Sequence, residues 1–176
     1  MRAVNAATTT LPGLGRARPT FASVAEAELD SMYSYLLFLT GDRDVAEDLT
    51  GTTFDKAFRT WPRFDPRRGT ARAWLCGIAR NAALDHFRAE QRRLRREAQY
   101  ARETPAAADP PWGEGIVAAA LRELSPAERE VVALRVVLDV DGPNAARILG
   151  ISATACSTRL SRAMKRLEEL MSDVRV

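Results

Sequence analysis

An all-α fold of two small helical domains is what the sequence predicts. A hydrophobic fraction of 46%, an aromatic fraction of 7% and only 10 glycines suit packed helical bundles. At 176 residues the chain has room for one domain of ordinary size or for two small ones. Residues 97–115 decide between these, because their prolines, alanines and scattered acids make a poor core and predict a flexible linker. We therefore expect one domain at residues 21–96 and another at residues 116–176.

Charge is distributed unevenly along the chain. Residues 21–62 carry eight acids and three bases, a net of −5, whereas residues 88–96 carry five arginines and one glutamate, a net of +4. The whole chain has a formal net charge of only +3. Such asymmetry indicates two kinds of partner, a basic protein surface and a polyanion. Ahead of both regions, residues 1–20 are rich in Ala, Thr, Gly and Pro, which predicts a disordered tail.

The first domain is expected to open with two helices, at about residues 24–39 and 45–61, where apolar residues recur at helical spacing. Gly41 ends the first of them, and either Asp42 or Asp44 can cap the second. Residues 62–69 then form a turn-rich connection, because proline and glycine punctuate them.

Residues 69–96 form the most informative stretch, an uninterrupted helical pattern. Its apolar residues fall on one expected core face: Ala71, Trp74, Leu75, Ile78, Ala79, Ala82, Ala83 and Phe87. A second face carries Asn81, Asp85, Arg88 and Arg92. An amide followed by guanidinium groups can read a base edge and hold phosphates. From this helix alone, a solvated amphipathic helix explains the pattern equally well.

The second domain contains clear helix signals. Residues 125–128 form a capping box with proline at the first helical position. A short helix is expected at about residues 143–149, ended by Gly150, and a long final helix is capped by Ser152. Two helices around a tight glycine turn, the second beginning with small polar and basic residues, are typical of a DNA-binding helix-turn-helix. The alternative is an ordinary helical hairpin.

Catalytic chemistry is poorly supported by the sequence. The single histidine, His86, lies inside an arginine-rich helix, and no nucleophile or ligand set has a workable spacing. Cys76 and Cys156 are isolated and are expected to be small core residues rather than a zinc site or a disulfide. We therefore expect no enzyme activity, no metal and no cofactor. Without an apolar run long enough to span a membrane and without a signal-peptide pattern, a cytoplasmic protein is expected.

Three segments together resemble one family. Residues 74–88 read W-L-x-x-I-A-R-N-x-A-x-D-x-x-R, and residues 121–135 read L-x-x-L-S-P-A-E-R-E-V-V-A-L-R. Residues 149–163 contain L-G-I-S followed by R-L-x-R-A. In this order they resemble the promoter-melting helix, the start of the C-terminal domain and the helix-turn-helix of bacterial RNA polymerase sigma factors. The similarity spans about residues 24–171 and is greatest to the extracytoplasmic-function (ECF) type.

The resemblance assigns roles to three sets of residues. Recognition and melting of the minus-ten element would involve Gly69, Thr70, Ala71, Arg80, Asn81, Arg88 and Arg92. Recognition of the minus-thirty-five element would involve Thr154, Ser157, Thr158, Arg159, Ser161, Arg162 and Lys165. Docking on the polymerase would involve Glu47, Asp48, Leu49 and Phe54. For the two acids, capping of their own helix is the structural alternative. For Trp74, a base-stacking role is set against ordinary burial, which internal tryptophans adopt more often.

The resemblance also implies the partners. They are core RNA polymerase, through its largest-subunit clamp helices and its flap, and promoter DNA, with an anti-sigma factor as a further candidate. The chain would direct polymerase to promoters and melt them. A stand-alone helix-turn-helix regulator is the alternative, although it leaves the acidic second helix and residues 69–96 without a purpose. Departures from the family pattern occur at Gly51, Thr52 and Ser157, and where the first helix of the helix-turn-helix reads Pro143-Asn144-Ala145-Ala146.

Overall fold

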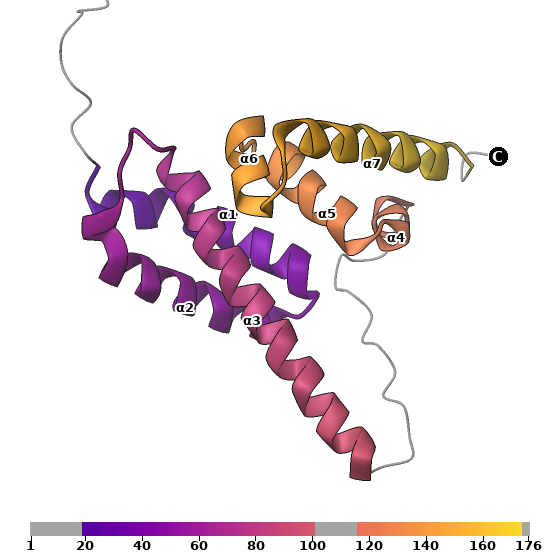
Figure 1. Cartoon of the computed structure of the whole chain (residues 1–176), viewed down its shortest axis with the longest axis horizontal. Helices are drawn as coiled ribbons and strands as arrows, with labels where there is room; N and C mark the ends of the chain where they lie inside the picture. The colour runs from indigo at the N-terminus through magenta and orange to yellow at the C-terminus, as the bar shows by residue number, and fades with distance from the viewer. Residues whose placement is uncertain (1–18, 101–115, 174–176) are drawn as a thin grey trace, which may run out of the picture.

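The computed structural model describes residues 19–100 and 116–173, and every regular element in these ranges is a helix (Figure 1). The all-α prediction is therefore confirmed. The expected disordered tail lies outside the described residues, except for Pro19 and Thr20, and so does the expected linker from residue 101 onward.

The first domain contains three long helices. α1 (Phe21–Thr40) and α2 (Arg43–Thr60) pair with each other, and α3 (Ala71–Tyr100) crosses both (Figure 1). Gly41 ends α1 at a φ of 75°, where a left-handed backbone favours glycine. Asp42 then caps α2, its Oδ1 accepting a hydrogen bond from the backbone N–H of Val45 at 3.1 Å. These two residues act as predicted.

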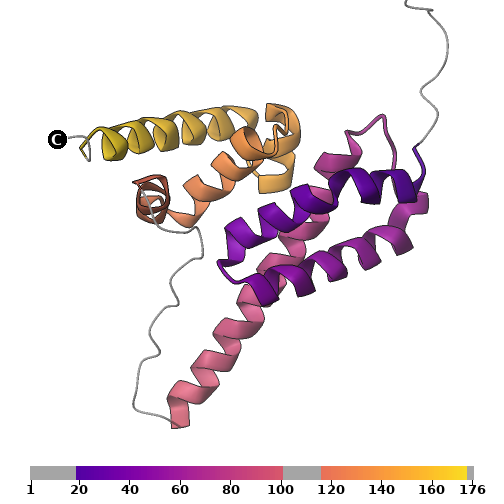
Figure 2. The ribbon, with the colours of Figure 1, turned by 180° about the vertical axis from the view of Figure 1, so that it is seen from behind.

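The core face predicted for α3 is confirmed with one exception. Met32 and Leu36 of α1 and Leu75 of α3 are fully buried. Phe87, predicted to be core, is 39% exposed. That prediction was wrong because Phe87 lines an open groove between α1, α3 and α5 (Pro126–Val132), so part of its ring faces solvent. Beyond this point the C-terminal part of α3 projects past α1 and α2 (Figures 1 and 2). α3 also continues to Tyr100, four residues beyond the expected domain end at residue 96.

The second domain is a compact set of shorter helices. They are α4 (Ile116–Glu123), α5 (Pro126–Val132), the π-helical segment η2 (Ala133–Val137), α6 (Gly142–Leu149) and α7 (Ala153–Asp173). The predicted capping box at Ser125 is present in full. Gly150 ends α6 in a left-handed conformation, with φ 68°, and the Ser152 hydroxyl accepts from the Ala155 N–H at 3.1 Å. Both residues of the tight turn therefore act as predicted.

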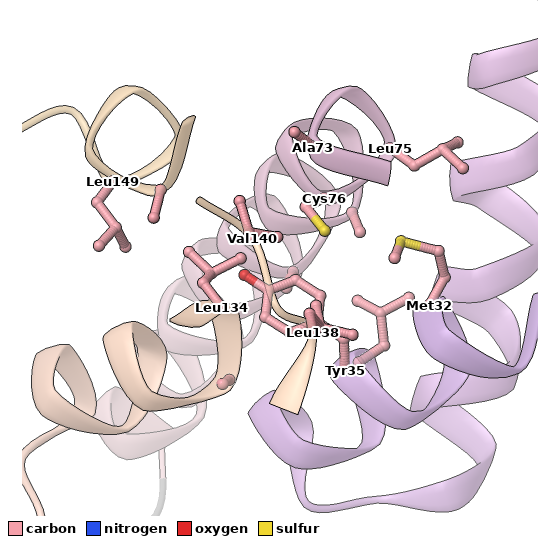
Figure 3. Close-up of a cluster of buried hydrophobic side chains, with 14 of the residues drawn as sticks. Met32, Tyr35, Ala73, Leu75, Cys76, Leu134, Leu138, Val140 and Leu149 are labelled. Carbon is pink, nitrogen blue, oxygen red and sulfur yellow. The ribbon is translucent and has the colours of Figure 1, made fainter. Parts of the chain in front are cut away.

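The two domains touch, which no sequence pattern predicts. α6 packs against α3, and η2 approaches α1. Buried side chains of both domains form one apolar cluster. Figure 3 shows Tyr35 of α1 reaching toward Leu134 and Val140 of the second domain.

Candidate nucleic-acid interface

The connection between η1 (Trp61–Arg63) and α3 is a folded turn. The Arg68 N–H donates to the Asp65 carbonyl at 3.0 Å, and the Asp65 carboxylate accepts from the Arg67 N–H at 2.9 Å. Thr70 then caps α3, its hydroxyl accepting from the Ala73 N–H at 3.1 Å. These local bonds hold the loop across the start of α3.

A cavity of about 480 Å³ lies between this loop and α3. Gly69, Thr70 and Asn81, all predicted from the family resemblance, line it together. Sequence reasoning missed two further lining residues, Arg63 and Arg68, both exposed. The basic residues within residues 62–69 could have pointed to these two arginines. Two guanidinium groups beside a polar cavity suit a nucleic-acid strand, whose phosphates they can hold while a base enters.

Aromatic side chains form the floor of this region. The rings of Trp61 and Phe64 stack with centroids 4.8 Å apart, and Trp74 meets them at 5.6 and 5.4 Å. Phe64 is buried, whereas Trp74 is half-buried and also lines the cavity. Burial of Trp74 in an aromatic cluster accounts for its position in α3. Its place in the cavity wall leaves a stacking role open.

The other predicted minus-ten residues are spread along α3. Arg88 and Arg92 are exposed on the same helix as Asn81, and Arg88 pairs with Asp85 at 3.2 Å. Ala71 is half-buried and is not among the cavity-lining residues. The face that bears Asn81, Asp85, Arg88 and Arg92 is open to solvent, as its spacing indicated.

Arg80 differs from its neighbours because it faces the second domain. Its Nε donates to Oε1 of Glu130 in α5 at 2.5 Å, and its Nη2 donates to Oε2 at 3.3 Å. The two side chains are only 19% and 14% exposed. In this arrangement Arg80 serves the contact between domains and presents no free guanidinium to DNA.

The start of α7 is a polar surface open to solvent. Thr154, Ser157, Thr158, Ser161, Arg162 and Lys165 are exposed, and Arg159 is half-buried. A groove of about 560 Å³ runs beside the helix, bordered by Thr154, Thr158 and Arg162 on one side and by the capping-box residues Ser125 and Glu128 on the other. The capping hydrogen bonds from Ser125 hold the pKa of the Glu128 carboxyl below its ordinary value. Small hydroxyl residues flanked by basic ones allow close approach to a DNA groove.

The outer face of α2 is acidic. Glu47 and Asp48 are exposed there, as a docking surface requires. Leu49, predicted to contact the polymerase, is 8% exposed and packs in the core, so it is unsuited to direct contact. Phe54 is half-buried. Sequence reasoning missed Phe58, which is 64% exposed on the same helix, because an aromatic at core spacing gave no signal of exposure.

Both cysteines are buried core residues, as predicted. Burial raises the pKa of the Cys76 thiol to about 12, so this thiol stays protonated and unreactive. Within residues 19–100 and 116–173, no group of three or more His, Cys, Asp or Glu side chains is placed to hold a metal ion. No helix in the described part of the chain has the length and apolarity to cross a membrane.

Comparison with known proteins identifies the family. Residues 24–93 match the family model Sigma-70 region 2, and residues 114–167 match the model Sigma-70, region 4. The ECF RNA polymerase sigma factor SigC of Mycobacterium tuberculosis is 30% identical over 86% of this chain and 81% of its own length. This chain is an ECF sigma factor. Its group supplies promoter specificity to bacterial RNA polymerase, as the family resemblance implied.

Other relatives agree with this assignment. The ECF sigma factor BldN of Streptomyces coelicolor is 32% identical over 87% of this chain, which spans 61% of BldN. The sigma factor RpoE of Bartonella quintana, solved with the anti-sigma factor NepR, superposes with a TM-score of 0.72 at 27% identity, covering 86% of this chain and 96% of that one. CnrH, solved with the cytosolic domain of CnrY, gives a TM-score of 0.63 at 26% identity, covering 87% and 88%. The predicted helical architecture of the family is thereby confirmed.

Proposed function

We propose that this sigma factor opens promoters by capturing a base of the melted strand in the cavity between residues 64–70 and α3. It would do so without catalysis of its own, in the cytoplasm, as part of the polymerase. The observation that supports the proposal is the convergence of Gly69, Thr70 and Asn81 on one cavity bordered by Arg63 and Arg68.

The chemistry of the cavity suits an unstacked base. The Asn81 side chain offers two donors and one acceptor, enough to discriminate among base edges. Arg63 and Arg68 can hold the phosphates on either side. Because only the melted strand can place a base in such a cavity, binding there favours the open duplex over the closed one.

The remaining surfaces would place the cavity on the promoter. Glu47 and Asp48 on α2 would dock on the clamp helices of the polymerase, with Phe58 as an exposed apolar neighbour on the same helix. The start of α7 would bind the minus-thirty-five duplex through Arg162 and its polar neighbours, while the flap would hold the second domain.

An anti-sigma partner is also proposed, since the similar sigma factor RpoE was solved with the anti-sigma factor NepR. A groove of about 500 Å³ between α1, α3 and α5 is the candidate place for it. Phe38, Leu39 and Phe87 line this groove, and they supply the apolar surface that an amphipathic helix would bury.

Run-off transcription tests the proposed function. The purified chain is added to core polymerase on genomic fragments, and transcripts that depend on the chain are mapped. Promoter-dependent transcripts are expected. Absence of binding to core polymerase, together with a symmetric footprint on duplex DNA, would identify a stand-alone regulator instead.

A further inference from the structure

Three arginines from two domains line one cavity, the one that we assign to base capture, so this inference rests on that proposed function. They are Arg63 and Arg68 of the first domain and Arg147 of α6. Among the described residues of the lining, Asp65 supplies the one carboxylate, and its Oδ1 accepts from the Arg67 N–H at 2.9 Å. Three guanidinium groups against one carboxylate leave the cavity wall with a net charge of +2.

These three arginines have no carboxylate partner within residues 19–100 and 116–173. Like charges gathered around one cavity repel each other, and an anionic ligand removes that repulsion. Guanidinium groups suit phosphate in particular, because two of their parallel N–H groups can bond two of its oxygens at once. The charge of the wall therefore fits a phosphorylated ligand.

Arg147 is held over the loop by neutral acceptors. Its Nη1 donates to the Arg68 carbonyl at 2.5 Å, and its Nη2 donates to Oδ1 of Asn144. Gly69 leaves the room for this approach, because a Cβ at residue 69 would lie 2.7 Å from Arg147 Nη2. A guanidinium has five N–H groups, so these two bonds leave others to donate. Arg147 is therefore positioned at the cavity and still able to bind a phosphate.

The part of the cavity wall formed by α3 has a hollow at Gly77. Four residues of one helix face line this part of the cavity: Trp74, Gly77, Ile78 and Asn81. A Cβ at Gly77 would meet nothing within 4 Å. Because glycine weakens a helix interior relative to alanine, what it adds here is space. A flat base fits such a hollow, with apolar surface from Trp74 and Ile78 and the Asn81 amide available for the base edge.

We propose that the free chain binds a soluble purine nucleotide with two or more phosphates in this cavity. The phosphates lie on Arg63, Arg68 and Arg147, and the base lies over Gly77. A purine is favoured because its two fused rings fill more of the hollow, and because asparagine forms paired hydrogen bonds with adenine. The volume of about 480 Å³ is within the range of small-molecule sites. A bound nucleotide occupies the groups that would hold a DNA strand, so it regulates base capture.

Isothermal titration calorimetry on the full-length chain, without polymerase or divalent cations, tests this proposal. The ligands are ATP, CTP, adenosine and inorganic triphosphate. ATP should bind at least about tenfold more tightly than each of the others, since only ATP supplies both a purine and the phosphates. Arg147→Ala should weaken ATP binding roughly tenfold, as loss of one hydrogen bond to a charged group implies. Gly77→Leu should abolish ATP binding, because its side chain fills the hollow.

Matched controls come from the same chain. Arg166→Ala removes an exposed arginine of α7 outside the cavity, and it should leave the affinity for ATP unchanged. Gly51→Leu makes the same change as Gly77→Leu at a helical glycine of α2 that also has open space around it, and it too should bind ATP like the parent. The Arg147 variant keeps the proposal testable if Gly77→Leu does not fold.

Three outcomes would overturn the inference. One is the absence of ATP binding by the parent, and another is equal affinity for ATP and inorganic triphosphate, which would mean an adventitious anion only. The third is an ATP affinity of Arg147→Ala equal to that of Arg166→Ala. Run-off transcription by the parent separates this inference from the proposed function, because a chain that transcribes but binds no nucleotide refutes the first and leaves the second intact.

Discussion

The two predicted DNA-binding surfaces of this sigma factor differ in what covers them. The cavity of the first domain is built from a loop and α3, and Arg147 of the second domain stands over it. The polar residues at the start of α7 are largely exposed to solvent, and α7 packs against α4, α5 and α6 of its own domain. The comparison teaches that the two surfaces differ in access, because a side chain of the other domain reaches the cavity whereas the start of α7 is open to solvent.

The largest effect is expected from Asn81→Ala, which tests whether the cavity of the first domain contacts a base. Open-complex formation should lose about 1–3 kcal/mol because a base contact disappears. Helix α3 should persist, since alanine is the better helix former. Permanganate reactivity of thymines near the start site, on matched and pre-melted templates, measures the loss. Gln91→Ala removes an exposed amide from the same helix outside the cavity and is the control. Equal promoter opening by Asn81→Ala and the parent would exclude base capture by Asn81.

Glu47→Arg combined with Asp48→Arg should weaken binding to core polymerase roughly tenfold, or about 1.4 kcal/mol. The reason is that two exposed acids on α2 become cations facing a basic surface. A pull-down or an anisotropy titration with core polymerase measures the change. The control is Glu26→Arg with Asp30→Arg, an equal charge change on the exposed side of α1. If both double variants bind polymerase alike, Glu47 and Asp48 are solvated surface charges and not a docking surface, since Asp42 already caps α2.

Arg162→Ala probes the uncovered surface of the second domain. Affinity for upstream duplex should fall, and the slope of log affinity against log salt should decrease by about 1, as loss of one phosphate contact requires. Single-strand binding should stay unchanged, which sharpens the contrast with Asn81. Arg166→Ala, an exposed arginine later on α7, is the matched control. An unchanged isotherm and slope would remove Arg162 from the contact surface.

Ser125→Ala should have the smallest effect, a loss of about 1 kcal/mol in the stability of the second domain. The capping bonds depress the folded pKa of Glu128, so their contribution is present above the unfolded pKa of about 4.3 and is lost as pH falls through the folded value. Urea unfolding should therefore show a larger deficit at neutral pH than at acidic pH. A deficit that does not change with pH would show that Glu128 plays no part in it.

Local features of the fold were predictable from the sequence because their causes are local. Gly41, Asp42, Gly150 and Ser152 each act within one helix end, where one residue type satisfies the backbone. The apolar face of α3 follows from the spacing of its residues in the same way. The prediction that Phe87 is buried was wrong because its burial depends on how closely α1 and α5 approach α3, a property of three helices at once.

The candidate site was predictable in part. Asn81 and the loop glycine were found through the family resemblance, and the structure brings them to one cavity. Arg147 was not predicted as part of that cavity, because it lies about 80 residues from the loop in sequence. The π-helical segment Ala133–Val137 was missed as well, because no particular residue types distinguish a π-helical turn from an α-helical one. Contacts between domains produce no periodic pattern in the sequence, so they could not be predicted from it.

The contacts that join the two domains, from Arg80 to Glu130 and from Arg147 to the Arg68 carbonyl, have a consequence for competition among partners. Because both domains belong to one chain, their association is intramolecular, so dilution of the protein does not weaken it. A polymerase that binds in trans must compete with this intramolecular association, whereas cleavage of the chain between the two domains would make the association depend on protein concentration.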